Sequence, residues 1–347
     1  MSGPIAPESD AATPENALAQ QCSAEQNQVV GQPTAFVQGL ASARPRKRDI
    51  HGWLLLDKPV GMTSTHAVTL AKRAFRARKA GHAGTLDPLA SGLLPIAFGE
   101  ATKTVPYVMD GRKAYRFTVR WGIETDTDDA EGKPVATSDH RPTPEHIEAI
   151  LQGFTGEIMQ IPPAYSALKI NGERAYDLAR DGEIVTLAAR AVEIHSLRMI
   201  ESHPDEAIFE ATCGKGTYVR ALARDFGRLL GCHGHIVALR RTRVGGFTEA
   251  ESHVAKRLEA VIQASTDEGL PSLMPVSAAL SNVPSASVSG HDAMRMRNGQ
   301  SVLLRGRDAP ILDGMVAVYC HEDLVALASF EQGELHPRRI FNLGENR

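Results

Sequence analysis

The chain has 347 residues, of which 42% are hydrophobic and 23% are charged, and its formal net charge at pH 7 is −3. This length allows two domains with a large core, and the composition is that of an ordinary globular protein. No apolar stretch approaches the roughly 20 residues of a membrane helix, so we expect no membrane span. The net charge does not by itself indicate a nucleic-acid binder.

Residues 1–48 have the composition of a tail. They are rich in Ala, Pro, Gln, Ser and Glu, show no sustained periodicity and end in the basic run at residues 44–48. This composition predicts a disordered segment. The segment has neither the pattern of a secretory signal nor, with its early acids, that of a transit peptide.

The cysteines indicate a reducing compartment. They are widely spaced and include no Cys-x-x-Cys pair, which is typical of free thiols: Cys22, Cys213, Cys232 and Cys320. We therefore expect a cytoplasmic protein.

Ordered structure is predicted to begin at the apolar run of residues 52–56, a short buried strand. Ser64 is positioned to cap a helix whose apolar face includes Val68, Ala71 and Phe75. Clean alternation of apolar and polar residues predicts a half-buried strand over residues 114–121.

Two further helices have start and stop signals. Thr143 and Pro144 begin one that Gly153 ends, and Thr217 caps another that Gly231 ends. A strand at residues 207–213 precedes the second helix.

The sequence pattern changes beyond about residue 270. Three prolines between residues 271 and 284 indicate a linker, and short strand-like runs follow at residues 302–304, 315–318 and 324–329. The chain lacks strict βαβ alternation, which favours an α+β fold. We predict a disordered tail at 1–48, a main domain at 49–270 and a small β domain at 276–347.

Basic residues gather in two stretches. Residues 58–86 contain six basic residues and no acid, and residues 211–243 contain seven with a single acid. One such cluster alone is most simply a solvated helix face. Two clusters flanking a candidate site favour a surface that follows phosphates, with an affinity that falls steeply with salt.

Several cofactor and metal motifs are incomplete. Residues 99–104 and 213–217 resemble parts of a P-loop without its glycine and lysine spacing. Asp126, Asp128 and Asp129 suggest an EF-hand, but the next positions do not fit. The Cys232–His235 stretch lacks a second ligand pair for zinc. We expect neither a metal nor a cofactor.

The most informative segment is residues 81–95. It presents one carboxylate, Asp87, from a stretch of small, apolar and turn-forming residues, in which three glycines and Pro88 restrict the backbone. His82 lies nearby. An isolated Asp-Pro is most simply an Asx-turn, whereas this longer run indicates a stiff loop that displays an acid.

Arg220 is placed unusually, in the first turn of a predicted helix. A cation there opposes the helix dipole at a cost of about 0.3–1 kcal/mol unless an anion is near. Arg220 therefore either extends into solvent or meets a carboxylate or phosphate. Pairing with Asp87 would hold that acid ionised, as a nucleophile requires.

Five ordered segments of residues 50–250 resemble motifs of the TruB family of tRNA pseudouridine synthases. They are residues 52–64, 81–95, 162–169, 215–220 and 235–242. A small departure is Ala83, where the family pattern suggests a hydroxyl residue. The resemblance implies a mixed, largely antiparallel central sheet with peripheral helices. The likeness of the C-terminal β domain to a PUA domain, which would bind RNA, rests on analogy.

The resemblance also implies roles for individual residues. Asp87 would be the nucleophile, and His82 would contact the RNA and help to extrude the target base. Tyr115 would stack on the flipped uracil, and Arg220 would pair with Asp87. The remaining substrate-binding residues would be Tyr218, Leu239 and Lys58.

The implied reaction is isomerisation of the uridine at position 55, in the T-loop of tRNA, to pseudouridine. The glycosidic bond to nitrogen breaks, the uracil rotates and a bond to carbon forms, and neither a metal nor a cofactor is needed. Three roles of Asp87 remain open: attack on the base, attack on the ribose, or action as a general base. Flipping the base costs a few kcal/mol, and stacking on Tyr115 returns roughly 1–3 kcal/mol. We expect a monomer that binds the T-arm and no membrane.

Two alternatives remain at this point. A non-catalytic tRNA-binding or tRNA-folding module would share the scaffold, although an acid facing a polyanion is unfavourable for pure binding. A guide-dependent synthase of the H/ACA type would share the catalytic motifs and carry additional protein-docking surfaces.

Overall fold

The computed structural model describes residues 46–166, 168–170, 173–174, 187–264, 267–304 and 314–344. The predicted tail lies outside these residues except for positions 46–48, and so does Cys22. The other three cysteines are free. Among the described residues, no helix is long and apolar enough to cross a bilayer.

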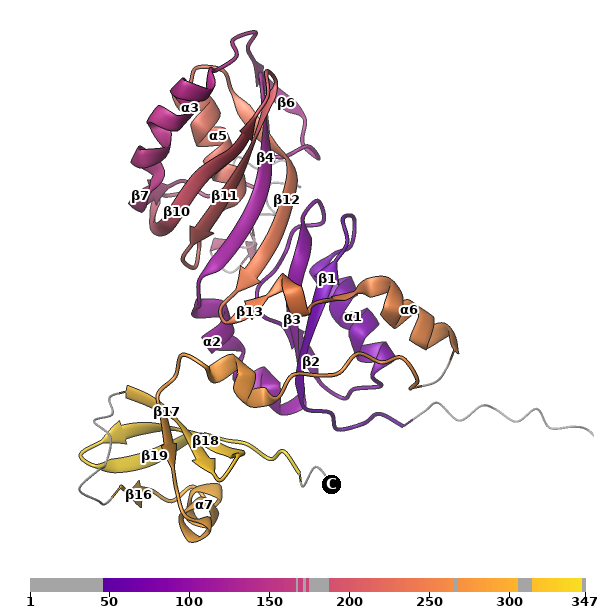
Figure 1. Ribbon diagram of the computed structural model, residues 1–347, viewed down its shortest axis with the longest axis vertical. Helices are drawn as coiled ribbons and strands as arrows, with labels where there is room; N and C mark the ends of the chain where they lie inside the picture. Colours follow the sequence, from indigo (N-terminus) through magenta and orange to yellow (C-terminus); the bar gives the residue numbers. More distant parts are fainter. Residues whose placement is uncertain are drawn as a thin grey trace, which may run out of the picture. The chain divides into compact units, whose positions relative to one another are not determined.

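A ten-stranded sheet forms the larger part of the fold (Figure 1). Its strands are β1 (Gly52–Lys58), β2 (Ala80–His82), β3 (Ser91–Phe98), β4 (Lys113–Trp121), β7 (Gly156–Gln160), β10 (Arg190–Ser202), β11 (Glu206–Cys213), β12 (Gly234–Val244), β13 (Phe247–Thr248) and β14 (His253–Val254). The order is β14-β1-β3-β12-β4-β11-β10-β7, with β2 beside β3 and β13 beside β12. Only β1–β14 and β12–β3 pair in parallel, which confirms the predicted mixed, largely antiparallel sheet.

Helices pack against this sheet. They are α1 (Ser64–Ala74), α2 (Val105–Asp110), α3 (Pro144–Leu151), α5 (Val219–Leu229) and α6 (Ala255–Ala264). Helices α3 and α5 lie beside β10 and β11 (Figure 1), and the ring of Phe226 in α5 is tilted against that of Phe209 in β11, with ring centroids 5.4 Å apart. The alternating strand at residues 114–121 is confirmed, because Phe117, Val119 and Trp121 all turn into this core.

Short elements complete the main region. Two-stranded ribbons pair β5 (Ile123–Thr125) with β6 (Pro134–Thr137), and β8 (Lys169–Ile170) with β9 (Glu173–Arg174). The 3-10 turns are η1 (Gly99–Lys103), η2 (Gln152–Phe154), η3 (Glu249–Glu251) and η4 (Val276–Leu280).

The C-terminal region is a second, five-stranded sheet in the order β15-β17-β18-β19-β16. Its elements are β15 (Ser285–Ser287), α7 (Gly290–Arg297), β16 (Val302–Leu303), β17 (Gly314–Cys320), β18 (Asp323–Glu331) and β19 (Glu334–Ile340). The small β domain expected from the sequence is therefore present. The last strand was not predicted, because its charged residues and Pro337 hide the alternation.

The proline-rich linker is more ordered than predicted. Met274 exchanges two backbone hydrogen bonds of 2.8 Å with Trp53. Val276 and Leu280 of η4 are buried in the same apolar cluster as Trp53. This segment is consequently part of the core, because its apolar side chains find partners far away in the chain.

Three helix boundaries differ from prediction. Thr63 caps α1, accepting from His66 N at 3.1 Å, and Ser64 is the first helical residue. Helix α5 begins at Val219, two residues after Thr217. Gly153 lies inside η2 and does not end α3 directly. Ser64 is not the cap, because its hydroxyl is hydrogen-bonded to the backbone of Leu86.

Candidate active site

Asp87 lies in the loop between β2 and β3. Glycines at and near this loop allow its backbone to approach β12 closely. Gly84 and Gly92 have φ of +100° and +99°, which side chains rarely adopt. A Cβ on Gly92 would lie 2.4 Å from the backbone oxygen of Arg241 in β12. The loop therefore needs glycine at position 92 to lie against β12.

Groups from other segments hold the loop backbone on both sides of Asp87. The hydroxyl of Ser64 donates to Leu86 O at 2.8 Å and accepts from Leu86 N at 2.9 Å. The backbone N–H of Gly61 donates to Pro88 O at 2.8 Å. The loop is thus fixed directly before and after the one acid that it displays, by contacts that are not visible in the local sequence.

Lys58 also contacts the backbone of this loop. It is fully buried, and its ammonium donates to Pro59 O at 2.9 Å, Met62 O at 2.7 Å and Pro88 O at 3.4 Å. Burial lowers the pKa of Lys58 to about 8, against the raising effect of Asp87. The side chain thus contacts the carbonyls of two loops and does not line the pocket beside Asp87.

The expected partner of Asp87 is in place. Arg220 Nε of α5 lies 3.0 Å from Asp87 Oδ2. The Arg220 side chain is 8% exposed, whereas that of Asp87 is 39% exposed, so the acid faces open space and its counter-ion does not. A carboxylate held this way stays accessible to a bound molecule.

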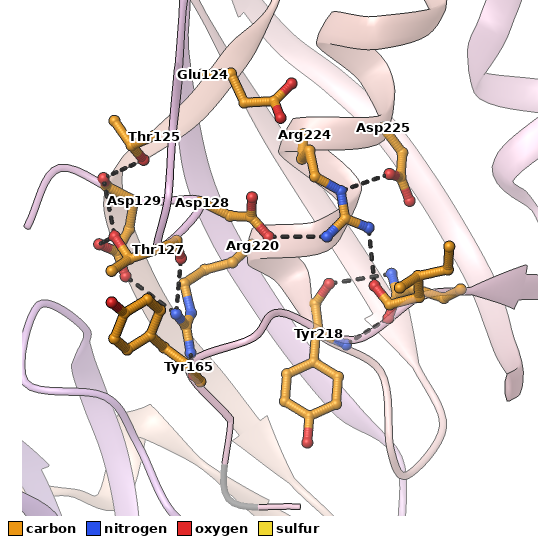
Figure 2. Close-up of polar contacts among 12 residues, drawn as sticks. Glu124, Thr125, Thr127, Asp128, Asp129, Tyr165, Tyr218, Arg220, Arg224 and Asp225 are labelled. Carbon is orange, nitrogen blue, oxygen red and sulfur yellow. Dashed lines mark hydrogen bonds and ion pairs between the residues drawn. The ribbon is translucent and has the colours of Figure 1, made fainter. Parts of the chain in front are cut away.

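The remaining donors of Arg220 are taken by other segments (Figure 2). They reach Thr127 O at 2.8 Å, Tyr165 O at 2.9 Å and Asp129 Oδ2 at 3.3 Å. The other oxygen of Asp129 accepts from Thr127 Oγ1 at 2.5 Å. One guanidinium therefore joins α5, the loop of Asp87, the loop of Asp129 and the segment before residue 167.

Arg220 is the first of three arginines spaced by one helical turn on α5. Arg224 pairs with buried Asp128 at 3.0 Å, and Arg228 pairs with Glu124 at 2.6 Å. Burial raises the pKa of Asp128 to about 6, against the lowering effect of Arg224. Two of the acids that we considered as an EF-hand, Asp128 and Asp129, thus hold their loop onto α5. The sequence signal was arginine at i, i+4 and i+8, which can meet a single row of acids.

A pocket of about 320 Å³ opens beside Asp87. This volume is at the small end of the roughly 300–1,000 Å³ typical of ligand sites. The lining includes the predicted residues Asp87, Tyr115, Tyr218, Arg220 and Leu239, together with Lys113, Lys215 and Arg241, which were not predicted. A larger hollow of about 860 Å³ lies near residues 275–277 and 341–344, but it contains none of the predicted site residues.

Both tyrosines of the pocket remain neutral near pH 7. Burial raises the pKa of Tyr115 to about 12 and also raises that of Tyr218. The backbone of Tyr218 is held by Gln160, which accepts from Tyr218 N at 2.8 Å and donates to Tyr218 O at 3.1 Å. Two neutral rings at fixed positions suit the stacking of a planar base.

His82 does not line this pocket. Burial, followed by the charge of Arg241, lowers its pKa, so the imidazole is neutral at pH 7. Its Nδ1 is buried and has no hydrogen-bond partner among the described residues. No group of three or more His, Cys, Asp or Glu side chains within those residues could hold a metal ion.

Comparisons with known proteins agree with this site. Residues 72–219 match the model of the TruB family pseudouridylate synthase N-terminal domain. Residues 220–281 match the tRNA pseudouridylate synthase B C-terminal domain. The chain is 61% identical over 311 residues to tRNA pseudouridine synthase B of Rhodopseudomonas palustris, covering 88% of this chain and 85% of that protein. It is 53% identical to that of Rhizobium meliloti, covering 86% and 99%.

Solved structures support the fold. The crystal structure of an archaeal box H/ACA sRNP Nop10-Cbf5 complex matches with a TM-score of 0.64 and 23% identity, covering 84% of this chain and 86% of that one. The predicted pseudouridine synthase-like fold is confirmed, and the alternative of a purely binding module is set aside. The chain belongs to the TruB family and is a tRNA pseudouridine synthase, an isomerase that converts a uridine of tRNA to pseudouridine.

Proposed function

We propose that the uridine modified is position 55, in the T-loop of tRNA, and that Asp87 carries the reaction. The observation that supports this most strongly is the ion pair of Arg220 with a half-exposed Asp87 inside a pocket lined by two tyrosines. An accessible carboxylate with a buried counter-ion can attack a flipped nucleotide or accept a proton from it.

The other pocket residues receive roles from their positions. Tyr115 stacks on the uracil, Tyr218 and Leu239 close the pocket around it, and Arg220 is the counter-ion of Asp87. Because the target base is buried in folded tRNA, it must be flipped out at a cost of a few kcal/mol. Stacking on Tyr115 then recovers roughly 1–3 kcal/mol.

His82 and Lys58 need separate consideration. We propose that His82 contacts the RNA during extrusion, since its neutral ring has a nitrogen without a partner among the described residues. The contacts of Lys58 favour a different role from direct substrate binding. Its ammonium is bonded to three loop carbonyls, so it serves the substrate by holding the loop of Asp87.

We further propose the domain roles expected from the sequence. Residues 49–270 form the catalytic domain, residues 276–347 form a PUA-like domain that adds affinity for RNA, and residues 1–48 are a tail. The enzyme acts as a cytoplasmic monomer on the T-arm. The reaction moves one glycosidic bond within one nucleotide, so it consumes no cofactor.

The test is to incubate the full chain with an unmodified tRNA transcript, without other RNA or protein, and to map pseudouridine by sequencing. We expect a single modified position, 55, and none in a transcript that carries cytidine there. Modification at other positions, or a requirement for a guide RNA, would overturn the proposal.

A further inference from the structure

Arg241 lies where three strands of the large sheet meet. In the register of β12, Arg241 is the antiparallel neighbour of Tyr115 in β4 and the parallel neighbour of Gly92 in β3. Cross-strand neighbours place their side chains on the same face of a sheet. Arg241 therefore stands beside the Tyr115 ring and directly under the loop that carries Asp87.

The guanidinium of Arg241 holds that loop at both ends. Nε donates to Leu93 O at 2.9 Å, Nη1 to Thr85 O at 3.2 Å and Nη2 to Gly84 O at 3.2 Å. The first contact lies after Asp87 in the chain, and the other two lie before it. The planar fork of arginine can span such separated carbonyls, whereas a lysine ammonium cannot.

The described residues bury this cation and give it no counter-ion. Arg241 is 2% exposed, and no carboxylate of the described residues forms an ion pair with it. Its positive charge contributes, after burial, to the lowered pKa of His82 and of Lys113. An unpaired buried charge is costly to fold, and well-packed apolar side chains often replace such groups at no loss. Stability alone is a poor reason for arginine at this position.

Arg241 also reaches the second participant in the pocket. The two side chains lie on the same face of the sheet, because Arg241 is the cross-strand neighbour of Tyr115. The guanidinium lowers the pKa of Tyr115, against the larger raising effect of burial. Arginine has only donors, so its favourable contact with the phenol is through the phenol oxygen.

We propose that Arg241 is a positioning residue of the isomerisation, which holds Asp87 and Tyr115 at a fixed separation through one guanidinium. This inference rests on the assignment of Asp87 and Tyr115 to the reaction made above. Arg241 itself does not act on the substrate. It determines where the acid and the stacking ring stand before the base arrives.

The test compares Arg241→Lys and Arg241→Gln with wild type in single-turnover reactions at saturating tRNA, with tRNA affinity measured separately. Misplacement by about 1 Å costs on the order of 100-fold in rate, so we expect a loss of that size in both variants. The dissociation constant for tRNA should stay within about threefold of wild type, or ~0.7 kcal/mol. Arg198→Gln, an exposed arginine of β10 outside the two basic stretches, is the matched control and should keep the wild-type rate.

A double-mutant cycle with Tyr115→Phe separates positioning from general damage to the fold. If Arg241 acts partly through the phenol, the two substitutions together should cost clearly less than the product of their separate effects. If Arg241→Gln does not fold, the cycle is run with Arg241→Lys, which keeps the charge. A rate within about threefold of wild type in folded Arg241→Lys, or effects that simply multiply in the cycle, would overturn the inference.

Asp87→Asn in the same assay keeps the two proposals apart. If it retains activity, the assignment of Asp87 fails. If it is inactive while folded Arg241→Lys reacts normally, only the role of Arg241 fails.

Discussion

Ser64 bonds both backbone polar groups of Leu86, at 2.8 Å to its oxygen and 2.9 Å from its nitrogen. The hydroxyl comes from the first residue of α1, and Leu86 directly precedes Asp87. Both residues are buried, so water cannot replace either bond. The position of Asp87 therefore depends on a helix that contributes nothing else to the pocket lining.

Ser64→Ala should weaken both the fold and catalysis. It leaves a buried N–H and a buried C=O without partners, which costs about 1–3 kcal/mol of folding free energy. The single-turnover rate should fall by about tenfold or more, because Ser64 no longer holds the loop backbone next to Asp87 in position. Thr69→Ala, which removes a hydroxyl from the exposed side of the same helix, is the control for denaturant unfolding and rate. Equal stability and rate in Ser64→Ala and Thr69→Ala would show that the two hydrogen bonds between Ser64 and Leu86 are dispensable.

Asp87→Asn should abolish turnover and spare binding. The amide is nearly isosteric but is neither a nucleophile nor a base, so the rate should fall by about 1,000-fold or more. Binding of tRNA should persist or tighten, because a negative charge that repels phosphate is removed. Pseudouridine mapping and filter binding measure the two effects. Turnover within about tenfold of wild type would contradict the assignment.

Arg220→Met should be more harmful than a lost surface ion pair. It leaves Asp129, whose side chain is 4% exposed, without its arginine, and breaking a buried pair costs on the order of 3–5 kcal/mol. Activity should fall by orders of magnitude.

Arg220→Lys should rescue poorly, because an ammonium cannot serve Asp87, Asp129 and two carbonyls together. The comparison needs folded protein, verified by circular dichroism, and rates at saturating tRNA. A near-normal rate in Arg220→Lys would mean that charge alone suffices.

The buried acid Asp128 should make stability depend on pH. Burial raises its pKa from 3.8 to about 6, so between these values the folded state binds more protons than the unfolded state. Its contribution to stability is fully present below the lower value and is lost as pH rises through the higher one. Denaturant unfolding of wild type and Asp128→Asn should show wild type losing relative stability between pH 4 and about 7.

Asparagine suits the test because it tolerates the φ of +61° at this position. Asp139→Asn, at an exposed site, is the control and should follow wild type at every pH. A constant difference between wild type and Asp128→Asn across the range would contradict the raised pKa.

Removing residues 1–45 should leave activity unchanged. The segment has no apolar pattern able to pack, so its loss should alter the rate at saturating tRNA by less than about twofold. Of the basic run at residues 44–48 this truncation removes only Arg44 and Pro45, so tRNA affinity should also change little at low salt. A shortened protein that folds but does not turn over would show that the tail takes part in the reaction.

Short-range sequence patterns were enough to predict the reaction and the local elements. The run around Asp87, the alternation ending at Trp121 and the arginine in the first turn of a helix are short-range patterns, and each was sufficient to predict an element or a functional residue. The pairing of Arg220 with Asp87 was expected from the resemblance to the TruB family, whereas its place in a first helical turn left it either in solvent or beside an anion.

The distant groups that contact the site could be identified only from the three-dimensional structure. Ser64, Asp129 and Arg241 act on the site through side-chain bonds to segments 22 to 157 residues away in the chain, and no local period marks such contacts. Lys58 shows the same limit. Its motif suggested substrate binding, whereas in the folded protein its buried ammonium donates to three backbone carbonyls. Hydrogen-bond partners of buried polar groups depend on strand order and register, which are properties of the whole sheet.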